Sequence, residues 1–205
     1  MKVLIVGSGG HARVVADILL AAPGVDPMGF LAPGTGAGEP FRGLAVLGRD
    51  PADVTGHDGV VLAVGDNRAR AALAEDYARR GVAFVPAVHP SAIVAPDAEL
   101  GPGCVICAGA VVGAGARIGA HAILNTGCSV DHDCVVGACC HVAPGARLAG
   151  AVTLGTGAFI GIGACVIQGR TIGDWATAGA GAAVVRNVRP GAVVVGVPAR
   201  ELQES

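Results

Sequence analysis

The chain has 205 residues and a formal net charge of −2, and it is long enough for one large domain or two small ones. Its longest basic cluster is Arg79-Arg80, so the composition argues against a nucleic-acid partner. The apolar run near the N-terminus is too short for a secretion signal or a membrane span, and the seven cysteines are an odd number. We therefore expect a cytoplasmic protein with reduced thiols and no membrane partner.

The first 86 residues alternate between expected strands and helices. The segment "KVLIV" at 2–6 has the apolar run of a buried strand, and a glycine-rich loop then leads into a helix expected from His11 to about Ala22. A second helix is expected over residues 67–80, and further strands at 28–31, 44–48, 59–65 and 83–86. Such alternation predicts a small parallel sheet, that is, an α/β Rossmann-like domain over residues 1–86.

The loop after the first strand has the spacing of a phosphate-binding turn. Gly7, Gly9 and Ala12 satisfy G-x-G-x-x-A where a strand passes into a helix, and the backbone N–H groups of such a turn bind phosphate. The acidic residue that would bind a dinucleotide ribose is absent after the second strand, where Ala32 and Pro33 stand. The loop therefore favours a nucleotide diphosphate over NAD.

The second half of the chain repeats every six residues. Fifteen successive hexads start at Val94; fourteen begin with Val, Leu or Ile, and the residue four places later is small and apolar in every hexad but the one with Arg170. A helix repeats at about 3.6 residues and an ordinary strand at about 2, so a period of six predicts a parallel β-helix. The pattern resembles the left-handed β-helix acyltransferases, in which three hexads make one coil of a triangular prism. We expect five coils within residues 87–186 and a C-terminal tail at 187–205.

The hexad register assigns directions to the side chains of a polar cluster, "SVDHDCVVGACCHVAPGA" at 129–146. Cys128, Cys134 and Cys140 fall on the small inward position, where a thiol packs as a compact apolar group. His132 and Asp133 fall at an outward corner. Because the thiols and the imidazole lie on opposite sides of the wall, they cannot converge on one ion, and we expect no metal site.

The prism surface carries few charges for its size. Only eight of the 90 residues in the hexad segment are charged, so much of the outward surface is Ala, Gly, Val or Ile. An apolar surface of that extent is normally covered by a partner. We therefore expect a homotrimer rather than a monomer.

Six segments resemble those of the PglD/NeuD-type sugar acetyltransferases, in the same order along nearly the whole chain: "VLIVGSGGHARVVADIL", "LAVGDNRAR", "HPSAIV", "NTGCSVDHDCVVG", "HVAPGARLAG" and "GVPAR". The resemblance implies an acetyl-CoA-dependent N-acetyltransferase that acts on the amino group of a nucleotide-linked 4-amino-4,6-dideoxy sugar. It also implies that the N-terminal domain holds the nucleotide sugar, that the β-helix forms a trimer, and that acetyl-CoA, the co-substrate, lies between neighbouring prisms.

The same resemblance assigns roles by position. It places the catalytic base at His132, the carboxylate that orients its ring at Asp133, and an N–H donor to the oxyanion at Gly150. Two regions depart from the family pattern: the residues after the second strand replace paired acids, and Arg170 replaces an aliphatic residue. The contacts to acetyl-CoA fall on His141, Ile162 and Ala180, and the contacts to the nucleotide sugar on Gly9, Gly10, His11, Gly65, Asp66 and Asn67.

Three alternatives remain open. A sugar O-acetyltransferase of the sialic-acid type would use the same base, because a hydroxyl and an amine both lose a proton on acetylation. A non-catalytic nucleotide-sugar-binding trimer would release no CoA. A γ-class carbonic anhydrase shares the prism but needs three histidines on zinc, and the spacing of His121, His132 and His141 does not bring them to one edge.

Overall fold

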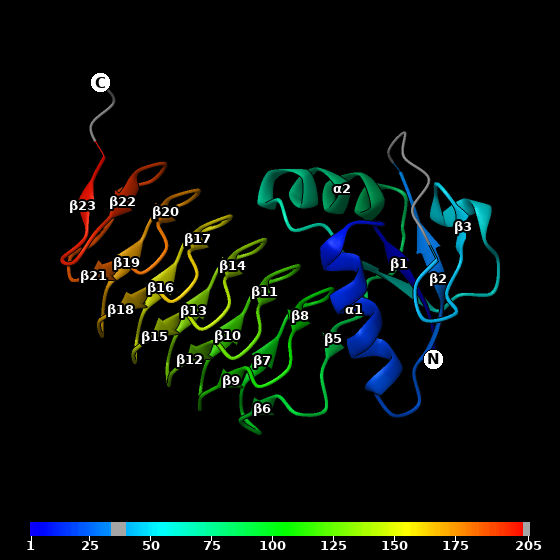
Figure 1. Cartoon of the computed structure of the whole chain (residues 1–205), viewed down its shortest axis with the longest axis horizontal. Coiled ribbons are helices and arrows are strands. Elements are labelled where there is room, and N and C mark those ends of the chain that lie inside the picture. The colour runs from blue at the N-terminus through cyan, green and yellow to red at the C-terminus, as the bar shows by residue number, and fades with distance from the viewer. Residues whose placement is uncertain (34–39, 203–205) are drawn as a thin grey trace.

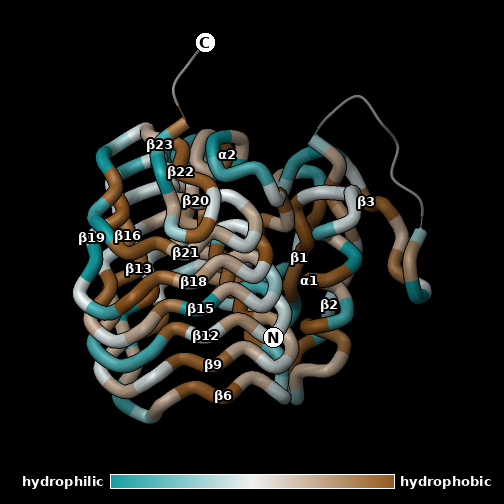
Figure 2. Tube along the Cα trace, turned by 60° about the vertical axis from the view of Figure 1, so that its left-hand side comes forward, coloured by the Kyte–Doolittle hydropathy of each residue, from teal (hydrophilic) through white to brown (hydrophobic). Residues whose placement is uncertain are grey.

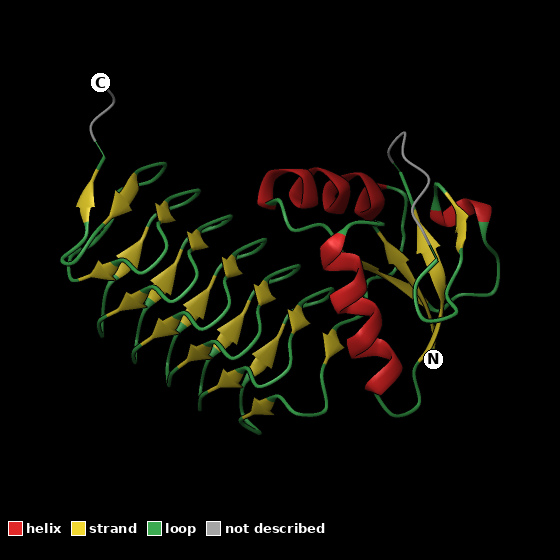
Figure 3. Cartoon of the chain, in the orientation of Figure 1, coloured by secondary structure: helices red, strands yellow, loops and turns green. Residues whose placement is uncertain are grey.

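The computed structural model of the protein describes residues 1–33 and 40–202. A small α/β domain lies beside the first coils of a long prism of short strands (Figure 1). The two long helices belong to the small domain (Figure 3). Within the described ranges, no helix is long and apolar enough to cross a membrane.

The small domain is a four-stranded parallel sheet with one long helix on each face. Alternate residues of the first strand point to opposite faces, so Val3 and Ile5 pack with one helix, whereas Leu4 and Val6 pack with the other. This arrangement confirms the Rossmann-like prediction, although the strand expected at 83–86 is reduced to a single bridge. The sheet order is β3-β2-β1-β4, with β1 (Lys2–Val6), β2 (Asp26–Leu31), β3 (Val46–Gly48) and β4 (Gly59–Leu62); the helices are α1 (Gly10–Ala21), α2 (Asn67–Arg79) and a short 3-10 helix at Pro51–Asp53.

The prism has three faces of stacked parallel strands, mostly two residues long. The domain face, which contacts the small domain, consists of β5 (Ala87–Val88), β8 (Val105–Ile106), β11 (Ile123–Leu124), β14 (His141–Val142), β17 (Phe159–Ile160), β20 (Thr177–Ala178) and β22 (Val193–Val195), with β23 (Arg200–Glu201) antiparallel at its end. The second face consists of β6 (Ile93–Val94), β9 (Val111–Val112), β12 (Ser129–Val130), β15 (Arg147–Leu148), β18 (Cys165–Val166) and β21 (Ala183–Val184). The third face consists of β7 (Glu99–Leu100), β10 (Arg117–Ile118), β13 (Val135–Val136), β16 (Thr153–Leu154) and β19 (Thr171–Ile172).

The hexad register predicts the prism core correctly. Ile123 pairs with His141 and Ser129 with Arg147, so each coil advances the chain by three hexads. The hexad leaders and the small residues four places later form one buried cluster, from Cys104 and Ile106 through to Ala182 and Val184. Figure 2 shows hydrophobic segments recurring from coil to coil along the prism. The fold is therefore a left-handed parallel β-helix joined to an α/β domain.

Arg170 is the exception in this core. The register places it on the inward position, yet its side chain is partly exposed and its Nε donates to the Gln168 carbonyl oxygen. It lies outside the buried cluster, whereas Val152, one coil earlier at the same position, lies within it. The strand ladder beside it continues, because Leu154 still pairs with Ile172. The expectation of an inward arginine is wrong, and the guanidinium keeps its contact with polar groups.

The prism also continues beyond residue 186, where the tail was expected to begin. Val188 bridges to Ile172, and β22 pairs with β20 in parallel. Val188 follows the leader Val184 by four residues instead of six, so strict six-residue spacing misses this last coil. The three faces have five, six and seven parallel strands, against the five coils expected.

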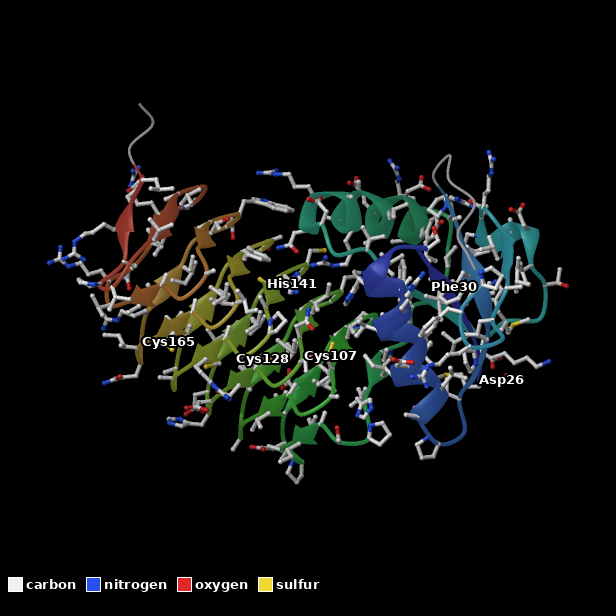
Figure 4. The ribbon with its side chains drawn as sticks, viewed as in Figure 1. Asp26, Phe30, Cys107, Cys128, His141 and Cys165 are labelled. Carbon is white, nitrogen blue, oxygen red and sulfur yellow. The ribbon has the colours of Figure 1, made fainter. Side chains whose placement is uncertain are left out.

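An apolar contact holds the small domain to the prism. Val15 and Leu19 of α1 share a buried cluster with Val105, Cys107 and Ile123 of the domain face. Figure 4 labels Cys107 at this boundary. The outward surface of these coils is thus covered by α1, and the small domain is set against the prism.

Candidate active site

His132 and Asp133 lie together at the corner that follows β12. Asp133 adopts a left-handed backbone conformation with φ of 59°, which aspartate tolerates better than most residues. Its Oδ2 lies 2.9 Å from Nδ1 of His132, and the two side chains are 70% and 68% exposed in the single chain. A carboxylate at Nδ1 keeps the proton there, so Nε2 carries the lone pair that a base needs.

Gly150 lies one coil further along the same corner. A Cβ atom at this position would collide with Nε2 and Cε1 of His132, so only glycine lets the ring lie against the backbone. No acceptor among the described residues receives the Gly150 N–H. The corner therefore places the histidine beside a free backbone donor.

His141 lies on the domain face, where the prism meets the small domain (Figure 4). Its Nε2 is 3.0 Å from Nδ2 of Asn125, and its ring meets Phe159 edge-on at 5.3 Å between centroids. The His11 ring of α1 lies 6.3 Å away, measured between ring centroids. The structure thus brings together two predicted site residues from the two domains.

Both of these imidazoles are neutral at neutral pH. Burial, followed by the charge of Arg70, lowers the pKa of His141 to about 4. Burial, followed by the charges of His141 and Arg70, lowers the pKa of His11 to about 4. Nε2 of His11 is buried and has no hydrogen-bond partner among the described residues.

The glycine loop before α1 separates into two roles. Gly7 has φ of +128°, and a Cβ atom there would lie 2.6 Å from the Ala63 carbonyl oxygen, so the fold requires glycine. Cβ atoms at Gly9 and Gly10 would meet nothing within 4 Å. Gly9 is the N-cap of α1 and no side chain caps the helix, so His11 does not have the capping role. The loop leaves open space at the helix N-terminus, where an anion binds favourably.

The two polar side chains of the loop before α2 form hydrogen bonds within the protein. Asp66 is the N-cap of α2, and its Oδ1 accepts from Ala69 N at 2.8 Å. Nδ2 of Asn67 donates to the Gly157 and Ala158 carbonyl oxygens at 3.1 and 3.3 Å. The side chains of Asp66 and Asn67 are therefore engaged in the protein. A cavity of about 340 Å³ lies at this loop, lined by Gly65, Asp66, Asn67, Arg68, Gly157, Phe159, Trp175 and Thr177.

Ile162 and Ala180 lie at a different edge from His132. They follow β17 and β20, at the corner between the domain face and the second face, and Ile162 is exposed. His132 and Gly150 lie at the corner between the second and third faces. One chain therefore does not bring all the predicted site residues together, because the whole second face separates the two groups.

The structure separates the candidate metal ligands. His121 is buried at the corner between the third face and the domain face, so His121, His132 and His141 lie at different places on the prism. Burial raises the pKa of the Cys128 and Cys140 thiols to about 12, which leaves them protonated. Within 1–33 and 40–202, no group of three or more His, Cys, Asp or Glu side chains is placed to hold a metal ion.

Arg70 is a functional candidate that the sequence reasoning missed. Its side chain is fully buried between the two domains and forms hydrogen bonds to both. The available signal is its place in α2, where Arg70, Ala74 and Tyr77 follow the spacing of one buried helix face. An arginine on that face indicates a buried polar contact.

Comparison with known proteins agrees with this architecture. The PglD N-terminal domain family matches residues 2–77. A crystal structure of a histidine-to-alanine mutant of GDP-perosamine N-acetyltransferase from Caulobacter crescentus, in complex with CoA and GDP-perosamine, is 41% identical; the match covers 100% of this chain and 98% of that one, with a TM-score of 0.92. No curated protein matches the chain.

Two further structures agree. The acetyltransferase domain of PglB from Neisseria gonorrhoeae FA1090 is 37% identical, with 98% and 99% of the two chains covered and a TM-score of 0.90. WeeI from Acinetobacter baumannii AYE is 26% identical, with 98% and 100% covered and a TM-score of 0.87. The fold and these relatives define an acyltransfer enzyme of the left-handed β-helix class. Within that class, the chain belongs to the PglD-type nucleotide-sugar acetyltransferases.

Proposed function

We propose that the protein transfers the acetyl group of acetyl-CoA to the amino group of a nucleotide-linked 4-amino-4,6-dideoxy sugar in the cytoplasm. The observation that carries the proposal is the corner where Asp133 holds Nδ1 of His132 and Gly150 presents a free N–H beside the ring. Relatives crystallised with CoA and GDP-perosamine, or with acetyl-CoA, support the two substrates.

The chemistry needs a base at this corner. A sugar amine is mainly ammonium at neutral pH, so it must lose a proton before its lone pair attacks the thioester carbonyl carbon. The ammonium releases this first proton to the solvent, Nε2 of His132 accepts the second proton of the amine as it attacks, and the Asp133 carboxylate stabilises the imidazolium that results. The Gly150 N–H stabilises the negative oxygen of the tetrahedral intermediate. Collapse of the intermediate breaks the C–S bond, and the proton passes from His132 to the departing CoA thiolate.

The site requires more than one copy of the chain. His132 and Gly150 lie on one edge of the prism, and His141, Ile162 and the small domain lie on the other side of the second face. In a homotrimer, the His132 corner of one chain faces the domain face of the next. Exposed apolar side chains near these edges, among them Val135, Ile162 and Ile167, support such an interface.

Product analysis tests the proposal. Purified protein is incubated with acetyl-CoA and a panel of GDP-, UDP- and dTDP-linked amino sugars, and the products are identified by mass spectrometry. We expect an acetylated product that survives hydroxylamine, because amides resist it and esters do not. A hydroxylamine-labile product would instead indicate O-acetylation, and the absence of CoA release with every sugar would indicate a binding protein without activity.

A further inference from the structure

Arg70 is a charged side chain in the interior of the protein. It projects from the first turns of α2 and is fully buried. Its six hydrogen bonds all go to carbonyl oxygens or to the Asn67 side-chain amide. Burying a guanidinium is costly unless its donors are paired, so this position indicates a specific task.

The guanidinium joins the loop before α2 to the prism. Nη1 donates to the Val64 and Gly65 carbonyl oxygens at 2.8 and 3.2 Å. On the prism side, Nε donates to the His121 oxygen at 2.8 Å, and Nη2 to the Cys139 oxygen at 2.8 Å and the Cys140 oxygen at 3.1 Å. Arg70 therefore sets the position of this loop relative to the domain face.

A second link reinforces the first. Nη2 of Arg70 also donates to Oδ1 of Asn67 at 2.8 Å, and Nδ2 of Asn67 donates to the Gly157 and Ala158 oxygens of the prism. The arginine thus orients the amide that makes the second set of contacts between the domains. The Asn67 side chain belongs to this link rather than to a ligand contact.

The link also determines where the loop donors point. The C=O and N–H of a trans peptide unit point in opposite directions. Because the Val64 and Gly65 carbonyls point at Arg70, the N–H groups of Gly65 and Asp66 point away from it. No acceptor among the described residues receives either N–H. These two donors, at the N-terminus of α2, suit an anionic group of a ligand.

We propose that Arg70 is a positioning residue for the nucleotide sugar, and that it holds the loop of residues 64–67 against the prism with the Gly65 and Asp66 N–H groups turned toward the substrate. The inference rests on the proposed function, because it assigns those donors to the nucleotide-sugar substrate. The charge of Arg70 also contributes to keeping His11 and His141 neutral beside the same loop.

Arg70→Lys tests the proposal. Lysine keeps the positive charge but has three donors on one atom and cannot serve carbonyls on both sides. When the loop is released, the Gly65 and Asp66 N–H groups no longer point at the anionic group of the ligand. The loss of these hydrogen bonds to a charged group reduces the affinity by about 10-fold or more. We expect the Kd for the nucleotide sugar to rise about 10-fold in calorimetry, while the Kd for acetyl-CoA and kcat change less than about threefold. The matched control is Arg79→Lys on the exposed side of α2, which should change neither Kd.

Amide hydrogen exchange tests the inference independently of the proposed function. In Arg70→Lys, and also in Asn67→Ala, which retains the arginine, the amides of residues 69 and 70, which donate to Asp66 of the loop, should exchange faster, while those of β12 and β15 should not. A wild-type Kd for the nucleotide sugar, or an equal loss of affinity for both substrates, would overturn the positioning role. Unchanged hydrogen exchange in the two variants would overturn it as well. If the wild type binds no nucleotide sugar, the proposed function fails, whereas the exchange result still decides whether Arg70 orders the loop. If the Arg70→Lys protein does not fold, the Asn67→Ala variant provides the test. We expect it to lose affinity for the nucleotide sugar but not for acetyl-CoA.

Discussion

At the scale of single residues, the proposed chemistry depends on the closeness of His132 to Gly150. The His132 ring lies where a Cβ atom at Gly150 would be. Nε2 of His132 and the Gly150 backbone are therefore close together. Asp133 is adjacent in sequence, and its left-handed backbone turns the carboxylate back onto Nδ1. The proposed base, the carboxylate proposed to orient it and the proposed oxyanion donor therefore lie at one corner of two successive coils.

The His132→Ala substitution should lower kcat by about 100-fold or more, since a positioned base contributes about that much. Asp133→Asn should give an intermediate loss of about 10-fold, because it removes the charge that stabilises the imidazolium but leaves the base. Steady-state acetylation with both substrates saturating measures kcat.

The matched control for these variants is His57→Ala, at a histidine of the small domain far from the corner in sequence and fold. It should retain the wild-type rate. A His132→Ala protein that acetylates as fast as the wild type would exclude this residue as the base.

At the scale of elements, the coil packs its small inward residues tightly. Cys134 is fully buried, and its Sγ donates to the Ala149 carbonyl oxygen at 3.2 Å. Cys134→Ala should lower the free energy of unfolding by about 1 kcal/mol, because it removes one buried atom from a close-packed core. Urea unfolding measures this loss, and kcat should not change.

Cys165→Ala is the control for that prediction, because its side chain is exposed on β18. It should not change the free energy of unfolding measured in urea. Equal destabilisation by the two substitutions would show that burial of the Cys134 thiol does not matter.

The sequence predicts an element well when the residues that determine its structure are close together in the chain. The hexad pattern predicts the wall, the inward cysteines and the outward His132 corner, because each side chain's direction follows from its place in one hexad. Residues 187–195 escape the pattern, since Val188 follows Val184 by four residues and no six-residue count reaches it. Arg170 is predicted wrongly because a long side chain can leave an inward position that a short one cannot.

The candidate site is predicted less completely than the fold. The roles of His132 and the glycine loop come from family resemblance, and the structure places these residues at a corner and beside open space. Arg70 was missed because its partners, such as His121 and Cys139, lie 51 and 69 residues away in the chain. No local pattern shows which carbonyl oxygens a buried guanidinium will meet.

At the scale of the whole molecule, the boundary between the domains carries neutral histidines. Burial is the main cause that lowers the pKa of His11, His121 and His141 to about 4. The unfolded chain takes up these protons near pH 6.5, and the folded chain takes them up only near pH 4. Stability is therefore full above about pH 6.5 and falls as the pH drops toward 4, by at most about 1.4 kcal/mol per pH unit for each histidine.

Urea unfolding at pH 7 and pH 5, at one protein concentration and followed by Trp175 fluorescence, measures this dependence. The midpoint should be lower at pH 5. His121→Asn should show a smaller difference between the two pH values, because one of the three groups is gone. Identical midpoints for the wild type at both pH values would contradict neutral burial of these histidines.

The central claim is that one active site is built from two chains, with His132 from one and the small domain from the next. Two inactive variants test it: His132→Ala, and Gly10→Trp, which fills the open space at the glycine loop without a clash at its Cβ. Co-expression with two different tags allows trimers that contain both variants to be isolated.

The measurement is the acetylation rate of those mixed trimers. In a ring of three chains of two kinds, one interface of the three joins an intact His132 corner to an intact small domain, so the account predicts about one third of the wild-type rate. A site contained within one chain would be damaged in every subunit. A mixed-trimer rate no higher than that of the two parent variants would contradict the shared site.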